Sequence, residues 1–125
     1  MNICDCIIDS AAFRAFGADT GEAGLRSFVA AYLGLLAGRV TRIRQAVAGG
    51  DACELWTAAA SLAASSSMIG ALGLAAEGRR LQELADSDEM AATRALAQEL
   101  DVLAGRTADG LRALLAAMPP LCQDH

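Results

Sequence analysis

Residues 58–84 read AAASLAASSSMIGALGLAAEGRRLQEL, a sequence typical of two helices joined at a glycine. Ala and Leu, which dominate it, have high helix propensities. Apolar and small residues recur here at steps of three and four, which predicts the buried stripe of a helix. The stripe comprises Ala59, Leu62, Ser66 and Ile69, and it extends back to Leu55 just before the segment. Gly70 then allows a break. The inward face of the next helix is predicted to hold Leu74, Leu81 and Leu84.

The longest apolar stripe of the chain precedes this segment. It predicts one continuous helix that starts after an N-cap at Thr20 and ends at Gly49-Gly50. Its apolar positions are Leu25, Val29, Tyr32, Leu36, Val40, Ile43 and Val47. Asp51, with Glu54 three residues later, then predicts a capped start for the following helix.

The N-terminal part of the chain predicts a short first helix. Asp9 or Ser10 caps it, and Gly17 ends it after about Phe16. Before the cap, two apolar residues are expected to tuck against the rest of the protein, namely Ile7 and Ile8.

The C-terminal part predicts a long last helix. It starts at a cap at Ser87 or Asp88 and stops at Pro119-Pro120, because proline cannot continue a helix. Its apolar positions are Met90, Leu96, Leu100, Leu103, Leu111, Leu114 and Met118.

These elements predict an all-α protein of one domain. Hydrophobic residues make up 54% of the 125 residues but aromatic residues only 4%, so the apolar content is mostly Ala and Leu. Short connections make successive helices antiparallel neighbours, which predicts an up-down-up-down four-helix bundle with a short extra N-terminal helix. We expect an N-terminal lead at 1–8, the bundle at 9–118 and a C-terminal tail at 119–125.

The charge distribution argues against several classes of partner. The formal net charge is −5 and Lys and Arg are not clustered, so we expect no nucleic acid partner. The uncharged run at 55–76 is built of Ala, Ser and Gly, so it is not expected to span a membrane. The first nine residues lack a basic region and do not look like a targeting signal. A cytoplasmic protein is expected.

The four cysteines do not predict a metal site. Cys4-x-Cys6 lacks the usual zinc-ligand spacing, and the single histidine is His125. In a reducing cytosol we expect the cysteines to be free thiols, and we expect neither a metal nor another cofactor. The two further cysteines are Cys53 and Cys122.

The central segment resembles the phosphate-carrying helix of histidine-phosphotransfer (HPt) domains, the intermediates of bacterial multistep phosphorelays. The resemblance rests on Leu62, Ser65, Ser66, Gly70, Ala71, Leu74, Ala75 and Leu81, and with the helix lengths it extends over about 7–118. The family pattern is Ala-His-x-Leu-Lys-Gly-Ser-Ser. Aligned to it, the position of the phospho-accepting His holds Ala60, the Lys position holds Ala63, and the Gly position holds Ala64.

The resemblance implies a scaffold without its chemistry. In the family, the imidazole takes a phosphoryl group from an aspartyl phosphate of a receiver domain, and nearby positive charge stabilises the transferred group. Ala60 offers no nucleophile and Ala63 no charge, so we expect a protein that is not an enzyme. Among other candidates, Ser65, Ser66 and Ser67 lack an adjacent base, and His125 lies in the polar tail.

The remaining candidate for a functional feature is a protein-binding surface. In HPt domains the face around the phospho-accepting His docks receiver domains. Here that face is predicted to consist of Trp56, Ala60, Ala63, Ala64 and Ser67, with Arg39 and Arg42 at its rim. Two simpler interpretations stay open. In the first, Trp56 packs over the preceding helix, since tryptophan is highly buried on average. In the second, the arginines form an ordinary solvated face. Arg79 and Arg80 are surrounded by acidic residues at or near helical spacing and are expected to form a surface salt-bridge face with Glu77, Glu83 and Asp86.

The sequence therefore predicts a non-catalytic HPt-like signalling module that binds a response-regulator receiver domain or a sensor histidine kinase without carrying phosphate. One alternative is a structural bundle that forms homodimers through Trp56 and the alanine patch. The other is a phosphocarrier that uses a residue outside the family pattern.

Overall fold

The computed structural model describes residues 7–87 and 89–118, and every regular element in these ranges is an α-helix. The helices are α2 (Ser10–Thr20), α3 (Glu22–Gly49), α4 (Ala52–Met68), α5 (Leu72–Ser87) and α6 (Met90–Ala117). The all-helical class predicted from the composition is therefore confirmed. None of the described helices combines the length and the apolar character that crossing a membrane requires.

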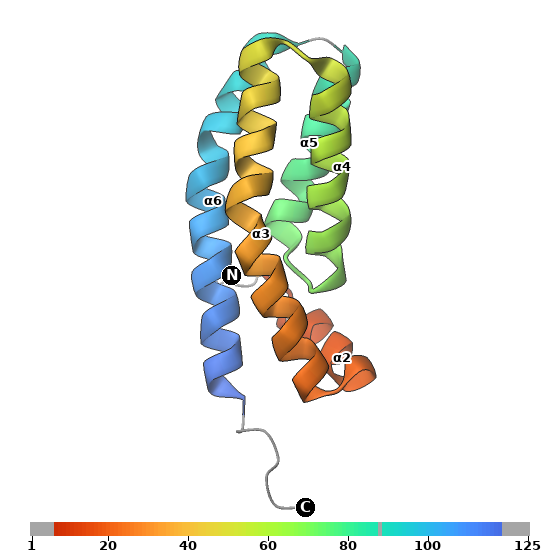
Figure 1. Ribbon diagram of the computed structural model, residues 1–125, viewed down its shortest axis with the longest axis vertical. Helices are drawn as coiled ribbons and strands as arrows, with labels where there is room; N and C mark the ends of the chain where they lie inside the picture. Colours follow the sequence, from red (N-terminus) through yellow and green to blue (C-terminus); the bar gives the residue numbers. More distant parts are fainter. Residues whose placement is uncertain (1–6, 88, 119–125) are drawn as a thin grey trace, which may run out of the picture.

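The long helices lie side by side as a bundle (Figure 1). α3 packs against α4 and α6, α5 packs against the same two helices, and α2 packs against α3. Figure 1 shows the α3–α4 and α5–α6 connections at one end of the bundle, whereas α2 lies toward the other end. Each long helix therefore buries its apolar stripe against two neighbours.

The core is built on the apolar stripe of α3. Every predicted position of this stripe, from Leu25 to Val47, is 6% exposed or less. The predicted inward residues of α4 and α5 are also buried, namely Leu55, Ala59, Leu62, Ser66, Ile69, Leu74, Leu81 and Leu84. α6 adds Leu100 and Leu111, which are fully buried. The helical periodicity thus predicted the inward faces of α3, α4 and α5 correctly. On α6 the prediction was only partly correct, because Leu96, Leu103, Leu114 and Met118 are partly buried and the buried positions Thr93, Ala97, Ala104 and Thr107 were not predicted.

Gly70 forms the turn between α4 and α5 and ties it to the N-terminal lead. Its φ of 78° lies in the left-handed region, which glycine adopts at little cost. A Cβ atom at Gly70 would lie 2.7 Å from the carbonyl oxygen of Asp9, and the Asp9 amide donates to the Gly70 carbonyl at 2.7 Å. Ile7 and Ile8, just before Asp9, are buried in the core as expected.

The prediction that Gly17 ends the first helix is wrong. α2 continues to Thr20, and Gly21, with a φ of 82°, terminates it. Gly17 serves a close contact instead, because a Cβ there would lie 2.8 Å from Leu25 Cδ2. Thr20 is not the N-cap of α3. It is the last residue of α2, and its hydroxyl donates to the Phe16 carbonyl at 2.8 Å.

The predicted caps of the first and last helices had different outcomes. Asp9 caps α2 as predicted, since its Oδ1 accepts from the amides of Ala11 and Ala12 at 3.0 and 3.2 Å. Ser87 is not the cap of α6 but the last residue of α5, and Glu89 precedes α6 without a side-chain capping bond. The predictions for Cys4, Cys6, Asp88, Pro119-Pro120, Cys122 and His125 concern positions outside the described residues.

Candidate functional site on the outer face of α4

The start of α4 is fixed by the Asp51 cap that the sequence predicted. Asp51 Oδ1 accepts a hydrogen bond from the Glu54 amide at 3.0 Å. The other half of a capping box is missing, because the Asp51 amide donates to the Ala46 carbonyl at 2.9 Å. The Glu54 carboxylate instead pairs with Arg42 of α3 at 2.6 Å. One of the two predicted rim arginines is therefore already neutralised by α4 itself.

Most of the predicted docking residues on α4 reach solvent. Trp56 is 43% exposed, Ala64 and Ser67 are exposed, and Ala60 is half-buried. Ala63 is buried, with 7% of its surface exposed, so the prediction that it lies on this face is wrong. Position 60, to which the resemblance assigns the phospho-accepting His, is thus half-buried, whereas position 63, to which it assigns the Lys, is covered.

Ala63 is covered because α5 approaches α4 closely at Gly78. A Cβ atom at Gly78 would lie 2.8 Å from the carbonyl oxygen of Ala59 and 2.9 Å from the Cβ of Ala63. Small residues on both helices permit this approach, and they leave no room for a long side chain between the helices. Ala63 is therefore a packing residue between α4 and α5.

The exposed stripe of α4 also contains residues that the sequence reasoning missed. Four further exposed residues lie on the same side of the helix as Trp56, Ala60, Ala64 and Ser67. They are Cys53, Thr57, Ser61 and Met68. The helical periodicity that predicts the buried stripe also places these four residues on the side of α4 away from that stripe, so the same spacing could have identified them. We call these eight residues the α4 outer face.

Two arginines from neighbouring helices flank the α4 outer face. Arg39 of α3 donates to Ser65 Oγ at 3.1 Å, and Arg79 of α5 donates to Ser67 Oγ at 3.4 Å. Among the described residues neither arginine forms an ion pair, so the expectation that Arg79 pairs with acidic neighbours is wrong. Hydroxyl groups leave the guanidinium charge uncompensated. The face is therefore flanked by positive charge although the chain carries a formal net charge of −5.

The serines of α4 serve helix packing. Ser65 donates to the Ser61 carbonyl at 2.9 Å, which is the local bond typical of serine inside a helix. Ser66 is fully buried, and its Oγ lies 2.7 Å from the hydroxyl of Tyr32 on α3. Burial raises the pKa of Tyr32, and the Ser66 hydrogen bond and the nearby charge of Arg39 partly offset this increase. Both hydroxyls are thus committed to joining α3 and α4.

The α4 outer face presents methyl groups, hydroxyls, a thiol, a thioether and an indole. It contains no imidazole and no carboxylate, which are the groups that general acid–base catalysis usually employs. Within 7–87 and 89–118, no three or more His, Cys, Asp or Glu residues gather closely enough to hold a metal ion. An exposed aromatic residue beside small apolar residues, with arginines at the edge, is the composition of a protein-binding surface.

Comparison with protein-family models, with curated proteins and with solved structures finds no match to this chain.

Proposed function

We propose that this protein is a non-catalytic HPt-like signalling module that binds a response-regulator receiver domain or a sensor histidine kinase without carrying phosphate. The observation that carries the proposal is the state of position 60. It lies on an accessible helix face next to Trp56 and Ala64, where the resemblance places a nucleophilic histidine, and it holds a methyl group. Such a face retains the exposed aromatic and small apolar side chains that docking requires, and it lacks the nucleophile that phosphoryl transfer requires.

The arrangement of the helices supports the proposal. We infer an up-down-up-down antiparallel bundle of α3 to α6, because each is joined to the next by a short connection and packs against it. α2 then takes the place of the short extra N-terminal helix. In this arrangement α4 has α3 and α5 as its neighbours, so residues from both can flank a partner that binds to the α4 outer face.

The charge at this face supports an acidic partner. Arg39 and Arg79 lie on either side of α4 and are bonded only to hydroxyls, so both can turn toward carboxylates of a docked protein. Receiver domains accept phosphate on an aspartate, and an acidic site of this kind complements the two guanidinium groups. Trp56, which is 43% exposed, then supplies the central apolar contact of the same interface. A cytoplasmic location follows from this role.

The experiment is incubation of the purified protein with a receiver domain carrying labelled phosphate. The protein should acquire no acid-labile label above background, because Ala60 offers no atom to attack the aspartyl phosphate. Ala60→His is the matched variant and should acquire label slowly, since Ala63 and Ala64 still withhold the charge and the space of the family pattern. Label on the unaltered protein would favour the alternative of a phosphocarrier with another acceptor.

A homodimer is the second candidate, and exposed apolar side chains favour it. Trp56 and Met68 of the α4 outer face are 43% and 53% exposed, and Leu35 of α3 is 55% exposed. A surface of this kind can pair with its own copy. Light scattering of the purified protein separates the candidates. A monomeric mass supports a surface that is free for a different partner, whereas a dimer that Trp56→Ala dissociates supports self-association.

A further inference from the structure

A concave site lies at the end of the bundle where α2 packs against α3, and it is lined by residues of α2, α3 and the C-terminal end of α6. It is a pocket of about 360 Å³, within the range of about 300–1,000 Å³ typical of ligand sites. Its walls are apolar side chains, and small residues leave the space open. The apolar walls are Phe13, Leu25, Leu114 and Met118, and the small residues are Gly17, Ala18 and Ala117. The pocket is separate from the α4 outer face, because none of its residues belongs to α4.

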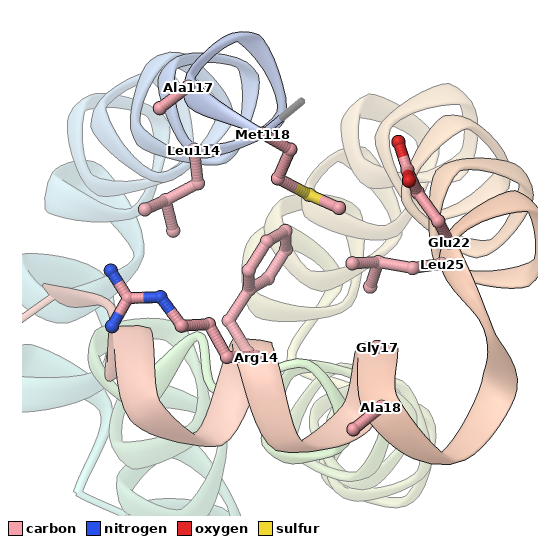
Figure 2. Close-up of a pocket in the computed structure, with 9 residues that line it drawn as sticks. Arg14, Gly17, Ala18, Glu22, Leu25, Leu114, Ala117 and Met118 are labelled. Atoms are coloured by element: carbon pink, nitrogen blue, oxygen red, sulfur yellow. The ribbon is translucent and has the colours of Figure 1, made fainter. Parts of the chain in front are cut away.

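The walls of this pocket are fixed by the core. Phe13 and Leu25 are each 1% exposed, so packing holds the deep side in place. Figure 2 shows Leu114 of α6 directed toward α2, and Met118, the C-cap of α6, directed toward Leu25 of α3. An apolar group that enters here replaces water against surfaces already shaped by the fold, which avoids the cost of reorganising them.

Two charged side chains line the opening, Arg14 from α2 and Glu22 from α3. They lie on different sides of it (Figure 2). Glu22 already has a counter-ion, since its Oε2 accepts from Nε and Nη2 of Arg26 at 3.2 and 3.1 Å. Arg14 is exposed and forms no hydrogen bond or ion pair with another described residue. The uncompensated charge at the opening is therefore positive.

We propose that this pocket binds a small monocarboxylic acid with an aliphatic body. The aliphatic part lies against Leu114, Ala117 and Met118, the apolar side chains of the pocket that solvent reaches, and the carboxylate pairs with the guanidinium of Arg14. The planar guanidinium matches a carboxylate through two parallel hydrogen bonds. A phosphate monoester fits less well, because it carries about −1.5 to −2 charges at neutral pH and the opening has one uncompensated cation. This site is independent of the proposed role in a phosphorelay.

The test is calorimetric titration of the full chain with octanoate, 1-octanol and octylammonium, which share a chain length and differ in charge. Octanoate should bind saturably and about tenfold more tightly than octanol, and octylammonium more weakly than either, because a charge-assisted pair at the opening favours the anion. In Arg14→Gln, octanoate should bind no better than octanol. Ala18→Trp should abolish binding of both, because the indole fills the space. Arg14 and Ala18 are both exposed, so both variants should fold.

Two controls test whether octanoate binds at this pocket and not elsewhere on the protein. Arg94→Gln removes an exposed arginine from the opposite end of α6 and should leave octanoate binding unchanged. In the unaltered protein, the methyl resonance of Met118 should shift on titration while that of Met68, on the α4 outer face, stays in place. Equal affinity of the unaltered protein for octanoate and octanol would overturn the proposal. So would a loss of octanoate affinity in Arg94→Gln as large as that in Arg14→Gln, or octanoate binding that survives Ala18→Trp. Absence of saturable binding would overturn it as well.

Discussion

At the scale of single residues, the close approach of α4 and α5 depends on the missing side chain of Gly78. The site where a Cβ would lie is 2.8 Å from the Ala59 carbonyl oxygen and 3.0 Å from the Ala63 amide nitrogen. Both atoms belong to backbone, so neither can move aside as a flexible side-chain end does. The same contact covers Ala63 and removes this residue from the surface of α4. One glycine thus shapes both the packing and the chemistry of the face.

Gly78→Ala should therefore destabilise the protein, even though alanine is the better helix former. We expect a loss of about 1–3 kcal/mol in the free energy of unfolding, typical of an added methyl group in a packed interface. Gly105→Ala is the matched control. It lies inside α6 with nothing within 4 Å of an added Cβ, and it should stabilise the protein by about 0.5–1 kcal/mol. Urea unfolding of both variants measures the difference, and equal stabilities would refute the close contact.

At the scale of helices, α4 is joined to each neighbour by a different kind of contact. Its contact with α5 is steric, through Gly78. Its contact with α3 includes a buried polar pair, in which the Tyr32 hydroxyl and Ser66 Oγ lie 2.7 Å apart. A buried hydroxyl without a partner costs free energy, so this pair fixes the register of α3 against α4. The pair therefore positions Arg39, which lies two turns after Tyr32 on α3 and bonds to Ser65.

Tyr32→Phe should cost about 1–2 kcal/mol of stability, because it leaves Ser66 Oγ buried without its partner. Ser66→Ala should cost a similar amount, and the double variant should lose less than the sum because the two hydroxyls serve one contact. Additive losses would show that the hydroxyls act separately. Chemical denaturation of the two single variants and the double variant measures all three values.

Tyr32 should also make the free energy of unfolding depend on pH. Burial raises the pKa of Tyr32, so the folded state holds the phenolic proton more tightly than the unfolded state does. The contribution of Tyr32 is therefore fully present below the ordinary tyrosine pKa and is lost as the pH rises through the raised pKa of the folded state. Tyr32→Phe should lose less stability over that alkaline window than the unaltered protein. A parallel pH profile for the two proteins would contradict the raised pKa.

Trp56 belongs to the helix scale because its role depends on which face α4 presents. At 43% exposure it is neither a core residue nor a free side chain. Trp56→Ala should weaken partner binding by more than about 2 kcal/mol, the range of an interface hot spot. It should destabilise the fold by less than the roughly 3–5 kcal/mol lost when a buried tryptophan is removed.

Val102→Ala is the control for this change. Val102 is a 62% exposed apolar residue on α6, outside the α4 outer face, and its replacement should alter neither quantity. Calorimetric binding and thermal unfolding of both variants separate the roles. A large loss of stability with unchanged binding would make Trp56 a packing residue.

At the scale of the whole molecule, the sequence predicted inward faces better than element ends or outward faces. The stripe from Leu25 to Val47 was predicted in full because its spacing depends only on helical geometry. Gly17 was misread as a helix end because a glycine in a close tertiary contact looks the same in sequence as a terminal one. Ala63 was misplaced for a related reason. Its angular position on α4 lies between the exposed Trp56 and the buried Ala59, and its Cβ faces α5 at Gly78.

We propose that a receiver domain or sensor kinase binds to the α4 outer face without passing phosphate to this protein. Calorimetric titration of receiver and kinase domains from the organism that encodes this chain, into the unaltered protein and into Ala60→Glu, tests it most directly. Glutamate is a good helix former and position 60 is accessible, so the variant should fold. One domain should bind the unaltered protein saturably and fail to bind Ala60→Glu, because the new carboxylate would be buried unpaired and would face an acidic partner. Binding of no domain in the panel, or equal binding to both proteins, would contradict the claim.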